Sequence, residues 1–339
     1  MRVVLDAMGS DTCPVTDVEG GVLAAREFGD TILLVGDQKQ ITNELAKYDV
    51  SGLKIEVVHA EEIILMTDKP SVVGKSKPQS SMHIGMTLVA DGKADAFVTA
   101  GNTGAVLAIA TLFALRRIPG VKRPALGSII RVEEDKSIIV LDIGANPDSK
   151  PDWLMQFAFM GHIYSQKALG ISAPRVALLS NGEEEGKGNQ LIRETSDLLK
   201  SSNLNFVGNI EPKDMLRGEA DVIVSDGFVG NIAIKSIEAM GSALSNLIRR
   251  EIRRDPMSTL GGLLARRAFR RVATLVDPFE IGGAPLLGVN GVVIIGHGRS
   301  NAKAIKNAVR QARLAVDGQV IQSIGEGLPT ASRQENEAG

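Results

Sequence analysis

Short apolar segments that end in polar, glycine-containing turns are the feature that most constrains the fold of this chain. Each segment holds four to six apolar, often β-branched residues, which is typical of buried parallel strands. Ligands of open α/β sheets bind beyond the carboxyl ends of the strands, so we expect the turns to gather along one rim. A rim rich in backbone N–H groups suits an anion, phosphate above all. The six segments are VVLDAMGSD (3–11), AFVTAGNTGA (96–105), IIVLDIGAN (138–146), VALLSNGEEEGKGN (176–189), VIVSDGFVGN (222–231) and VVIIGHGRSN (292–301).

Helical patterns fill most of the gaps between the predicted strands. This alternation favours parallel βαβ units with helices on both faces of a sheet. The predicted strands are 2–6, 31–35, 54–58, 95–99, 125–131, 137–142, 175–180, 204–208, 220–225 and 291–295. The predicted helices are 15–28, 38–47, 80–91, 103–117, 151–168, 189–200, 229–254, 258–275 and 301–322.

The composition indicates a large aliphatic core and no general attraction to a charged polymer. Hydrophobic residues make up 44% of the 339 residues and aromatic residues only 4%. With a net charge of −2, binding to nucleic acid is not expected, and any anionic partner has to meet a local patch. The single cysteine, Cys13, excludes an internal disulfide and fits a reducing cytosol.

No targeting or membrane-spanning segment is expected. The first strand is predicted to begin at Arg2, which leaves no room for a signal peptide. The longest apolar run, 105–115, is shorter than the roughly 20 residues that a helix needs to span a bilayer.

Residues 246–276 are unusually basic, with eight arginines against two acidic residues. Pro256 and the pair Gly261-Gly262 are predicted to mark a break between two helices. The result is a helical hairpin over 240–276 with an apolar tip and basic flanks. It is either a solvated or dimer-forming hairpin, or a contact for an anionic surface such as membrane headgroups or an acidic protein. The candidate contact residues are Leu260, Leu263, Leu264, Arg253, Arg254, Arg266 and Arg267.

Several familiar catalytic patterns are missing from the sequence. Gly74-Lys75-Ser76 resembles the end of a P-loop, but Lys69 stands where the first glycine is required. No G-x-G-x-x-G follows a predicted strand, the four histidines lack metal-ligand spacing, and no G-x-S-x-G elbow is present. We therefore expect neither a covalent nucleophile nor a cofactor, and no metal. The alternative is a magnesium site built from acids at strand ends, namely Asp6, Asp11, Asp142 and Asp226.

Two strand-to-helix turns are the strongest candidates for binding phosphate. Asn102, Thr103 and Gly104 lead from a strand into a helix, where side chains and unpaired N–H groups can hold phosphate oxygens. The alternative is a simple N-cap, for which Asn and Thr are favoured. A turn of the same type runs from Asp226 to Asn231, and the pair of turns favours a ligand.

Two further loops carry cations that suit an anion. Lys187 lies between two glycines, downstream of Asn181, and can approach a small oxyanion closely as a point charge. The alternative is a solvated loop with an acidic helix start. Lys75 and Lys77 lie on a Pro-bounded loop that precedes the helix near Ser80; this loop either covers an anionic ligand or is simply mobile.

Seven ordered motifs of the chain resemble those of the bacterial phosphate acyltransferases of phospholipid synthesis. They are LDAMGSD, KPSVVGKSKPQSSM, VTAGNTGA, LDIGAN, LLSNGEEEGKG, ADVIVSDGFVGN and GGAPLLGVNG. The resemblance covers about residues 1–325, taken as one α/β domain, and residues 326–339 are predicted to be a disordered tail. It implies a Rossmann-like three-layer α/β/α fold with a mostly parallel sheet, similar to isopropylmalate dehydrogenases and phosphotransacetylases, plus the helical hairpin.

The resemblance also implies a reaction and partners. The enzyme would move a long-chain acyl group from acyl-carrier protein to orthophosphate, giving acyl phosphate for a glycerol-3-phosphate acyltransferase. It would be a cytoplasmic homodimer whose hairpin touches the membrane. The alternative is an NAD(P)- and metal-dependent β-decarboxylating dehydrogenase of related fold. The chain departs from the family pattern at Ser10, usually Gly, and at Lys75, Ser76 and Lys77, where arginines are usual.

Neither phosphate nor a thioester needs a covalent enzyme intermediate, because phosphate is already nucleophilic and a thiol is a good leaving group. The protein has to supply placement and stabilisation of the oxyanion. We expect Lys187 and Asn231 to orient phosphate or stabilise the oxyanion, and Asp226 to take a proton or orient a donor. The predicted phosphate-binding residues are Asn102, Thr103, Gly104, Asn181, Lys75 and Ser80.

Overall fold

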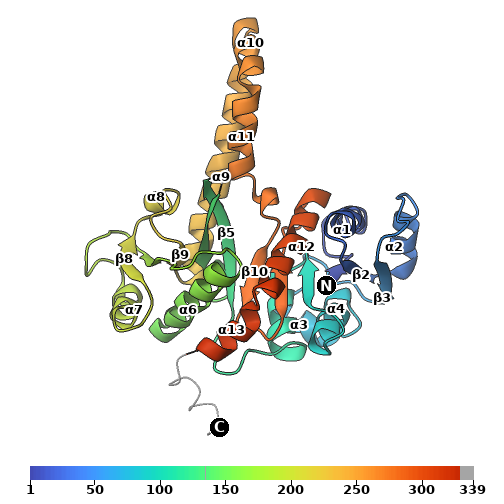
Figure 1. The fold of residues 1–339 in the computed structure, drawn as a ribbon, viewed down its shortest axis with the longest axis horizontal. Coiled ribbons are helices and arrows are strands. Elements are labelled where there is room, and N and C mark those ends of the chain that lie inside the picture. Colours follow the sequence, from blue (N-terminus) through green and yellow to red (C-terminus); the bar gives the residue numbers. More distant parts are fainter. Residues whose placement is uncertain (134, 329–339) are drawn as a thin grey trace.

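The computed structural model describes residues 1–133 and 135–328 and has helices on both faces of one sheet (Figure 1). The strands are β1 (Arg2–Asp6), β2 (Thr31–Gly36), β3 (Ile55–His59), β4 (Ala96–Thr99), β5 (Ala125–Glu133), β6 (Lys136–Leu141), β7 (Val176–Leu179), β8 (Phe206–Ile210), β9 (Val222–Val224), β10 (Ala284–Leu287) and β11 (Val292–Ile295). Their order in the sheet is β3-β2-β1-β4-β11-β10-β5-β6-β9-β7-β8. The predicted three-layer fold with a mostly parallel sheet is confirmed.

The helices largely match the predicted ranges. They are α1 (Val15–Phe28), α2 (Gln38–Leu45), α3 (Pro70–Ser76), α4 (Ser81–Ala90), α5 (Thr103–Ala108), α6 (Pro151–Lys167), α7 (Gln190–Lys200), α8 (Pro212–Met215), α9 (Gly227–Ile252), α10 (Pro256–Leu264), α11 (Arg266–Val276), α12 (Ala302–Asp317) and α13 (Val320–Gly327). A π-helix, η1 (Ile109–Phe113), continues α5, and a 3-10 turn, η2 (Pro278–Glu280), precedes β10.

Some predicted helices divide or end early for local reasons. The predicted helix 301–322 is two helices, because Gln319 takes a left-handed conformation with φ 51° between them. Helix α13 runs to Gly327 and Leu328 is buried, so the predicted start of the tail at 326 was too early. The rest of that tail, residues 329–339, lies outside the described residues.

Strand β10 was not predicted, and it changes the direction of the sheet. It pairs antiparallel with both β11 and β5, and β5 pairs antiparallel with β6. The three reversals make β6, β9, β7 and β8 run opposite to β1, β4 and β11. The prediction of one common rim for the six turns was therefore wrong: the turns form two sets that point in opposite directions along the sheet.

The two sets nevertheless meet at the centre of the sheet. Ile295, the last residue of β11, is level with Ala284 of β10, and Leu141, the last residue of β6, pairs with Gly127 of β5. Leu286 pairs with Leu126, which places both strand ends within about one residue of the same level. The carboxyl ends of β11 and β6 thus approach each other from opposite sides.

The core divides unequally between the two faces of the sheet. On one face a single hydrophobic cluster runs under α1, α12, α6 and α7, with Val3, Leu5, Ile139 and Leu141 pointing into it. On the other face there are two clusters, one under α4 and α5 and one under α8 and α9. Ile143 packs against both of these. The central strands are therefore less covered on this second face.

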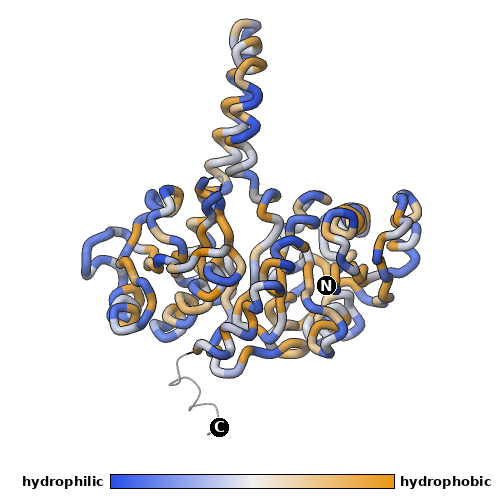
Figure 2. The backbone as a smooth tube through the Cα atoms, viewed as in Figure 1, coloured by the Kyte–Doolittle hydropathy of each residue, from blue (hydrophilic) through white to orange (hydrophobic). Residues whose placement is uncertain are grey.

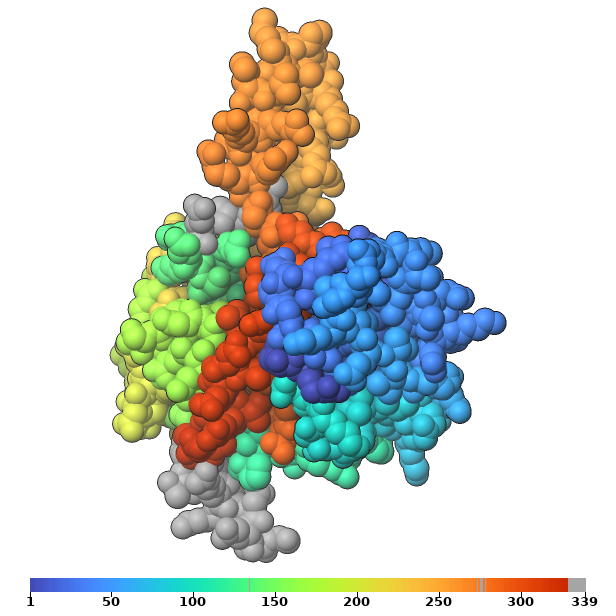
Figure 3. Space-filling model, turned by 45° about the vertical axis from the view of Figure 1, so that its right-hand side comes forward, coloured from blue at the N-terminus to red at the C-terminus, as the bar shows by residue number. Residues whose placement is uncertain are grey.

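The predicted hairpin is a stalk of helices that stands clear of the rounded body (Figures 1 and 3). We call residues 240–276 the stalk. Pro256 starts α10, as predicted, but Gly261 and Gly262 lie inside α10 and do not break it. Instead, α10 packs closely on α9, because a Cβ on Gly262 would meet Ile252 Cγ2 at 2.4 Å. Hydrophilic and hydrophobic segments alternate along the stalk (Figure 2).

The stalk exposes large apolar side chains. Leu263 and Leu264 near its tip are 63% and 79% exposed, and Met257 is 77% exposed. Four arginines, Arg249, Arg250, Arg253 and Arg254, line a shallow hollow beside them. Among the described residues, no helix combines the length and apolar content needed to cross a membrane.

The base of α9 is fixed to the turn after β6, and this contact predicts a pair of opposite effects on stability. A Cβ on Gly230 would meet the Asp142 carbonyl oxygen at 1.9 Å, whereas Gly241 in the same helix has open space around it. Gly230→Ala should lower the free energy of unfolding by about 1–3 kcal/mol or more, because backbone atoms have to move. Gly241→Ala should raise it by about 0.5–1 kcal/mol. Urea unfolding of both variants checks this, and equal effects would contradict the packing described.

Candidate functional site

A cavity of about 370 Å³ lies over the central strands, between the start of α5 and the base of α9. Five segments enclose it: the start of α5, strand β5, the turn after β6, the face of α9, and the loops on either side of β10 and β11. Its polar lining residues are Thr103, Ser128, Asn231, Lys235, Glu238, His297, Arg299 and Ser300. Its large apolar lining residues are Leu107, Leu126, Ile129, Ile143, Ile234, Phe279, Ile281 and Ile295. The cavity is thus amphipathic, with cations and hydroxyl groups beside an aliphatic wall.

The start of α5 brings Thr103 and Gly104 to the cavity. Asn102 caps this helix by accepting a hydrogen bond from the Ala105 N–H at 3.1 Å. Its Nδ2 points elsewhere and lies within hydrogen-bond distance of the carbonyl oxygens of Leu65, Met66 and Asp68, at 3.3, 3.1 and 3.1 Å. The Asn102 amide therefore holds the 65–68 turn, while the N–H groups of Thr103 and Gly104 remain for a ligand.

The turn after β6 is built around the buried carboxylate of Asp142. It accepts hydrogen bonds from four backbone N–H groups and from Asn146 Nδ2, at 2.6–3.1 Å. Burial raises the pKa of Asp142, and the five donors oppose that shift. This turn also supports α9, because Asn231 Nδ2 donates to the Ile143 carbonyl oxygen at 3.0 Å. Asn231 lines the cavity from this fixed position.

Asp226 caps α9 and does not line the cavity. Its Oδ1 accepts from the N–H groups of Phe228 and Val229 at 3.0 and 2.8 Å. Capping by Asp is typically worth about 1 kcal/mol to a helix. Asp226 therefore fixes the start of the helix that carries Asn231, Lys235 and the rest of the cavity face.

The turn after β11 presents His297 and Arg299 to the cavity. The buried Ser300 closes this turn, since its Oγ accepts from the His297 N–H at 3.1 Å and its own N–H donates to the His297 carbonyl at 2.8 Å. The Arg299 N–H donates to His297 Nδ1 at 3.3 Å, so the neutral ring carries its proton on Nε2. Burial, with nearby Arg299 and Lys235, lowers the pKa of His297 and keeps the ring neutral at physiological pH.

Two cations, Lys235 and Arg299, line the cavity. Lys235 pairs with Glu238 at 3.0 Å, and both residues line the cavity. The guanidinium of Arg299 has no hydrogen-bond or ion-pair partner within residues 1–133 and 135–328. An arginine left unpaired at a cavity matches the fork geometry of a phosphate or carboxylate.

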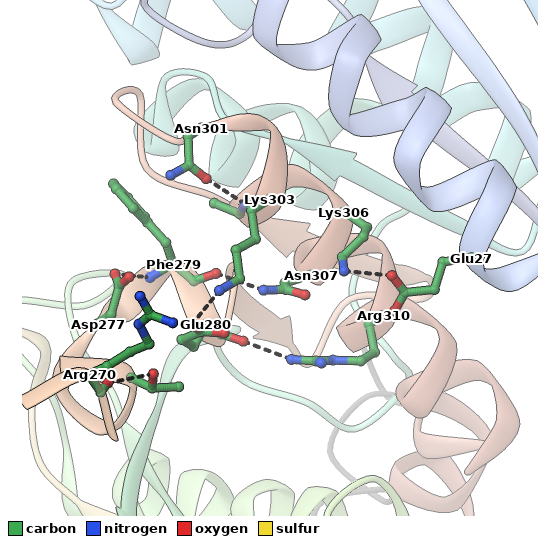
Figure 4. A network of polar contacts seen from close by, with 12 residues as sticks. Glu27, Arg270, Asp277, Phe279, Glu280, Asn301, Lys303, Lys306, Asn307 and Arg310 are labelled. Carbon is green, nitrogen blue, oxygen red and sulfur yellow. Dashed lines mark hydrogen bonds and ion pairs between the residues drawn. The ribbon is translucent and has the colours of Figure 1, made fainter. Parts of the chain in front are cut away.

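The segment between the stalk and β10 forms one wall of the cavity and is fixed to α12 (Figure 4). Asn307 Nδ2 donates to the Phe279 carbonyl at 2.8 Å, and Arg310 donates to the Glu280 carbonyl at 2.7 Å. Lys303 pairs with the Glu280 carboxylate. The Phe279 ring points away from α12 in this view. Both ends of the stalk therefore lead into residues that line the cavity.

The turn after β1 lies beside the 297–300 turn, and the buried acids on either side of it, Asp6 in β1 and Asp17 in α1, are paired with hydroxyl groups. The Asp11 N–H donates to the Gly298 carbonyl at 2.8 Å. Thr99 donates to Asp6 at 2.7 Å, and Ser10 donates to Asp17 at 2.6 Å. The serine at position 10 thus has a defined partner. Burial raises the pKa of Asp6, and it raises the pKa of Asp17 to about 7.

The acids proposed for magnesium do not come together in the described part of the chain. The group of acids there whose oxygens lie close enough to share an ion is Glu183, Glu211 and Asp214. Lys213 already pairs with Glu183 and Glu211 at 3.0 and 2.9 Å. This group does not line the cavity.

Four other predicted residues lie away from the cavity lining. Lys187 is on the exposed loop after β7, where its N–H donates to the Glu184 carbonyl at 3.1 Å. Asn181 closes the same loop by accepting from the Gly188 N–H at 3.1 Å. Lys75 is exposed in the last turn of α3. Ser80 is fully buried, and it caps α4 through His83.

Six polar lining residues were not predicted from the sequence: Ser128, Lys235, Glu238, His297, Arg299 and Ser300. Three of them lie in HGRS, inside the sixth of the polar turns that the sequence does reveal. His297 has no metal-ligand spacing to another histidine, so only its place in that turn could indicate it. Lys235 lies one turn after Asn231 on α9, and helical spacing from Asn231 would have found it.

Comparisons with known proteins give a consistent family. Residues 1–323 match the family model described as "Fatty acid synthesis protein". The chain is 46% identical over 338 residues to a phosphate acyltransferase of Citrifermentans bemidjiense, covering 98% of this chain and 96% of that protein. It is 47% identical over 328 residues to one of Trichlorobacter lovleyi, covering 97% and 94%. A phosphotransacetylase structure from Streptococcus pyogenes shares the fold, with a TM-score of 0.61, 17% identity and coverage of 95% and 94%.

The buried Asp17 predicts a stability that falls as pH rises. Its pKa is about 7 in the folded chain against 3.8 as the ordinary value, so between these values the folded state holds a proton that the unfolded state has lost. The free energy of unfolding should therefore decrease from about pH 4 to pH 7, by up to about 4 kcal/mol from this group. Asp17→Asn removes this dependence. The free energy of unfolding of this variant should therefore rise relative to that of the original chain as pH increases. Urea unfolding at several pH values checks this. A difference in the free energy of unfolding between variant and original chain that does not change with pH would contradict the prediction.

Proposed function

This chain belongs to the phosphate acyltransferase family, and we propose that it transfers an acyl group from a thioester to inorganic phosphate in the cavity between α5 and α9. Acyl-carrier protein is the donor, and a long-chain acyl phosphate for phospholipid synthesis is the product. The observation that carries the choice of site is the unpaired guanidinium of Arg299 on a cavity shared with Thr103, Gly104 and Asn231. Family membership also weighs against the dehydrogenase alternative, which would need a nucleotide and a metal.

The phosphate site draws on both halves of the sheet. Thr103 and Gly104 offer backbone N–H groups from the first half, and Asn231 offers an amide from the second. Arg299 binds two phosphate oxygens as a fork, and Lys235 adds a point charge by moving from Glu238. Asn102 and Asp226 act here as positioning residues, because their side chains hold the 65–68 turn and the start of α9.

The chemistry needs placement more than an activated residue. A phosphate oxygen attacks the thioester carbon, the C–S bond breaks, and the sulfur leaves as a thiol; phosphate gives up the proton that the sulfur gains. Between these events a tetrahedral oxyanion has to be stabilised, and each such donor is worth about 100–1,000-fold in turnover. The neutral His297 ring, with its proton on Nε2, is a suitable donor because it adds no positive charge that would hold the product phosphate.

We propose the same role for Lys187 although it does not line the cavity, because its exposed side chain can reorient when the substrate binds. It lies on the loop after β7, in the same set of carboxyl ends as the turn after β6. From there it can orient the donor thioester or the oxyanion once the substrate is bound. Asn181 supports it by closing the loop on Gly188. Lys75 and Ser80 are proposed at the outer edge of the phosphate path, with Ser80 acting through its cap on α4.

The stalk is the proposed contact with the membrane. Leu260, Leu263 and Leu264 are exposed near its tip, and Arg253, Arg254, Arg266 and Arg267, close to them in the sequence, are also exposed. Apolar residues that enter the interface together with arginines that meet anionic headgroups are typical of peripheral membrane contacts. We propose a cytoplasmic homodimer that is held at the membrane in this way, near the glycerol-3-phosphate acyltransferase that uses the product. The same arginines are the alternative docking surface for the acidic carrier protein.

The proposed reaction predicts acyl hydroxamate after hydroxylamine is added to purified chain, hexadecanoyl-acyl-carrier protein and phosphate. Formation should depend on phosphate. Arg299→Ala should raise the KM for phosphate by at least about tenfold, because a bidentate charged contact is lost. Lys187→Ala should lower turnover by more than about tenfold, as expected for an oxyanion donor.

Two controls separate the parts of this proposal. Lys39→Ala, at an exposed position of α2, should leave both constants unchanged. Hydroxylamine also cleaves the thioester directly, so a sample without enzyme gives the background. Hydroxamate above this background that forms without phosphate would contradict the reaction itself. If the reaction proceeds but the Arg299 and Lys187 variants behave like the Lys39 variant, the cavity assignment is wrong and another site binds phosphate.

The stalk proposal predicts sedimentation with anionic phosphatidylglycerol vesicles. Changing Leu260, Leu263 and Leu264 together to Glu should abolish pelleting, because three charged groups would have to enter the interface. Changing Leu198 and Val207 to Glu, at exposed positions of α7 and β8, gives the matched control and should not alter pelleting. Unchanged pelleting of the tip variant would remove the membrane role from the tip.

A further inference from the structure

The cavity is small for a long acyl chain together with phosphate. Its volume is about 370 Å³. Cavities that bury drug-sized ligands have volumes of about 300–1,000 Å³, so this one lies near the lower end of that range. Phosphate and the thioester group take up part of it. We therefore expect a long chain to continue beyond the cavity along an apolar surface that begins at its rim.

One apolar surface is joined to the rim by direct contacts. Leu65 and Met66 are 55% and 44% exposed, and they lie on the turn that the Asn102 amide holds. A Cβ on Gly298 would meet Met66 Cε at 2.7 Å, so Met66 touches the turn that carries His297 and Arg299. The surface therefore starts at the position where the thioester carbonyl and phosphate have to meet.

The same surface continues away from the cavity over α3 and η1. A Cβ on Gly104 would meet Pro70 Cγ at 2.5 Å, which places the start of α3 on the start of α5. Further along, Gly74 packs on the Phe113 ring, where a Cβ would lie 2.8 Å from Cε2. Phe113 is 42% exposed. Leu65, Met66 and Phe113 lie along this side of the cavity, and we call these three residues the apolar lip.

The lip is held in a fixed shape by polar contacts on its inner side. Lys77 Nζ donates to the Ile63 carbonyl at 2.8 Å and to Asp68 at 2.6 Å. Asp68 also accepts from the Leu65 N–H at 2.8 Å. The backbone polar groups of the turn are thereby satisfied from within, which leaves the outward side chains of Leu65 and Met66 as the surface that meets solvent. An ordered apolar surface can bind a flexible chain without first having to become ordered itself.

The other exposed apolar surface near the cavity belongs to α9, and most of it turns away. Asn231, Ile234, Lys235 and Glu238 line the cavity at helical spacing. Val229, Met240 and Leu247 are exposed but lie about half a turn from that face, on the opposite side of the helix. Phe228 and Ile232, on its flank, are the nearest alternative.

We propose that the apolar lip binds the distal part of the acyl chain of the thioester donor and so sets the preference for chain length. This inference rests on the proposed transfer of an acyl group to phosphate. The carbonyl end of the donor lies in the cavity beside His297, the first methylene groups pass Met66, and the remainder of the chain lies along Leu65 and Phe113. Each further methylene group that is covered by the lip strengthens binding in the transition state as well as in the ground state.

The test compares kcat/KM for hexadecanoyl- and hexanoyl-acyl-carrier protein in the full chain. Leu65→Glu and Phe113→Glu should lower the hexadecanoyl-to-hexanoyl ratio by at least about tenfold, because the longer chain alone reaches these two residues. The ratio removes effects on carrier docking, phosphate binding and folding, which act on both donors equally. Leu198→Glu is the matched control, because Leu198 is also an exposed leucine, on α7. It should keep the ratio within about twofold of that of the original chain.

The outcomes separate this inference from the proposed function. If the original chain forms acyl phosphate but the lip variants keep its ratio, or lose both donors equally, the lip does not bind the chain. If Phe228→Glu or Ile232→Glu lowers the ratio in their place, the chain leaves along α9 and the lip assignment is overturned. If the original chain forms no acyl phosphate from either donor, the proposed function itself has failed.

Discussion

The direction of the central strands is the constraint on which the rest of this structure depends. Because β10 pairs antiparallel with both neighbours and β5 pairs antiparallel with β6, the two halves of the sheet run in opposite directions. Their carboxyl ends meet at one level, with Ile295 on one side and Leu141 on the other. Helices α5 and α9 follow the neighbouring strands β4 and β9, and they cover the outer parts of the same face and leave the centre open. A cavity with walls from both halves is the geometric result, and neither half could form it alone.

Two buried side-chain groups convert this topology into a rigid site. The Asp142 carboxylate organises the turn after β6 through five N–H donors, and Gly230 lets the base of α9 rest directly on that turn. On the other wall, the Asn102 amide ties the 65–68 turn to the start of α5. Groups of this kind matter because removing one partner leaves buried donors or acceptors unsatisfied, at about 1–3 kcal/mol each. Thr103 and Asn231 thus face each other across a fixed gap, which is what placement of a small anion requires.

The sequence predicts the elements of this fold well and their directions poorly. Apolar runs and helical periodicity locate ten of the strands to within a few residues, because most of those strands are buried on both faces and read as continuous hydrophobic segments. Strand β10 escapes since APLL is short and contains proline, which lacks the ladder donor. Thr103, Gly104 and Asn231 could be found from strand-to-helix turns. His297 and Arg299 could not be singled out, because their value depends on which turn opens onto the gap between α5 and α9, and that follows from the pairing of β10.

The sequence shows no motif for a covalent nucleophile with its base and acid. The cavity instead separates charged and hydroxyl groups from an aliphatic wall. Cations and hydroxyl groups come from loops and helix faces, where Arg299 and Lys235 remain adjustable, while the aliphatic wall comes from the sheet and from Ile234 and Phe279. A dianion and an acyl chain make opposite demands on solvent, since one needs charge and the other needs exclusion of water. A small cavity that meets both demands places the reacting carbonyl at the boundary between its charged part and its apolar part. In the proposed reaction, phosphate and thioester meet at that boundary, and positioning there does the work that a covalent intermediate does in other acyl transfers.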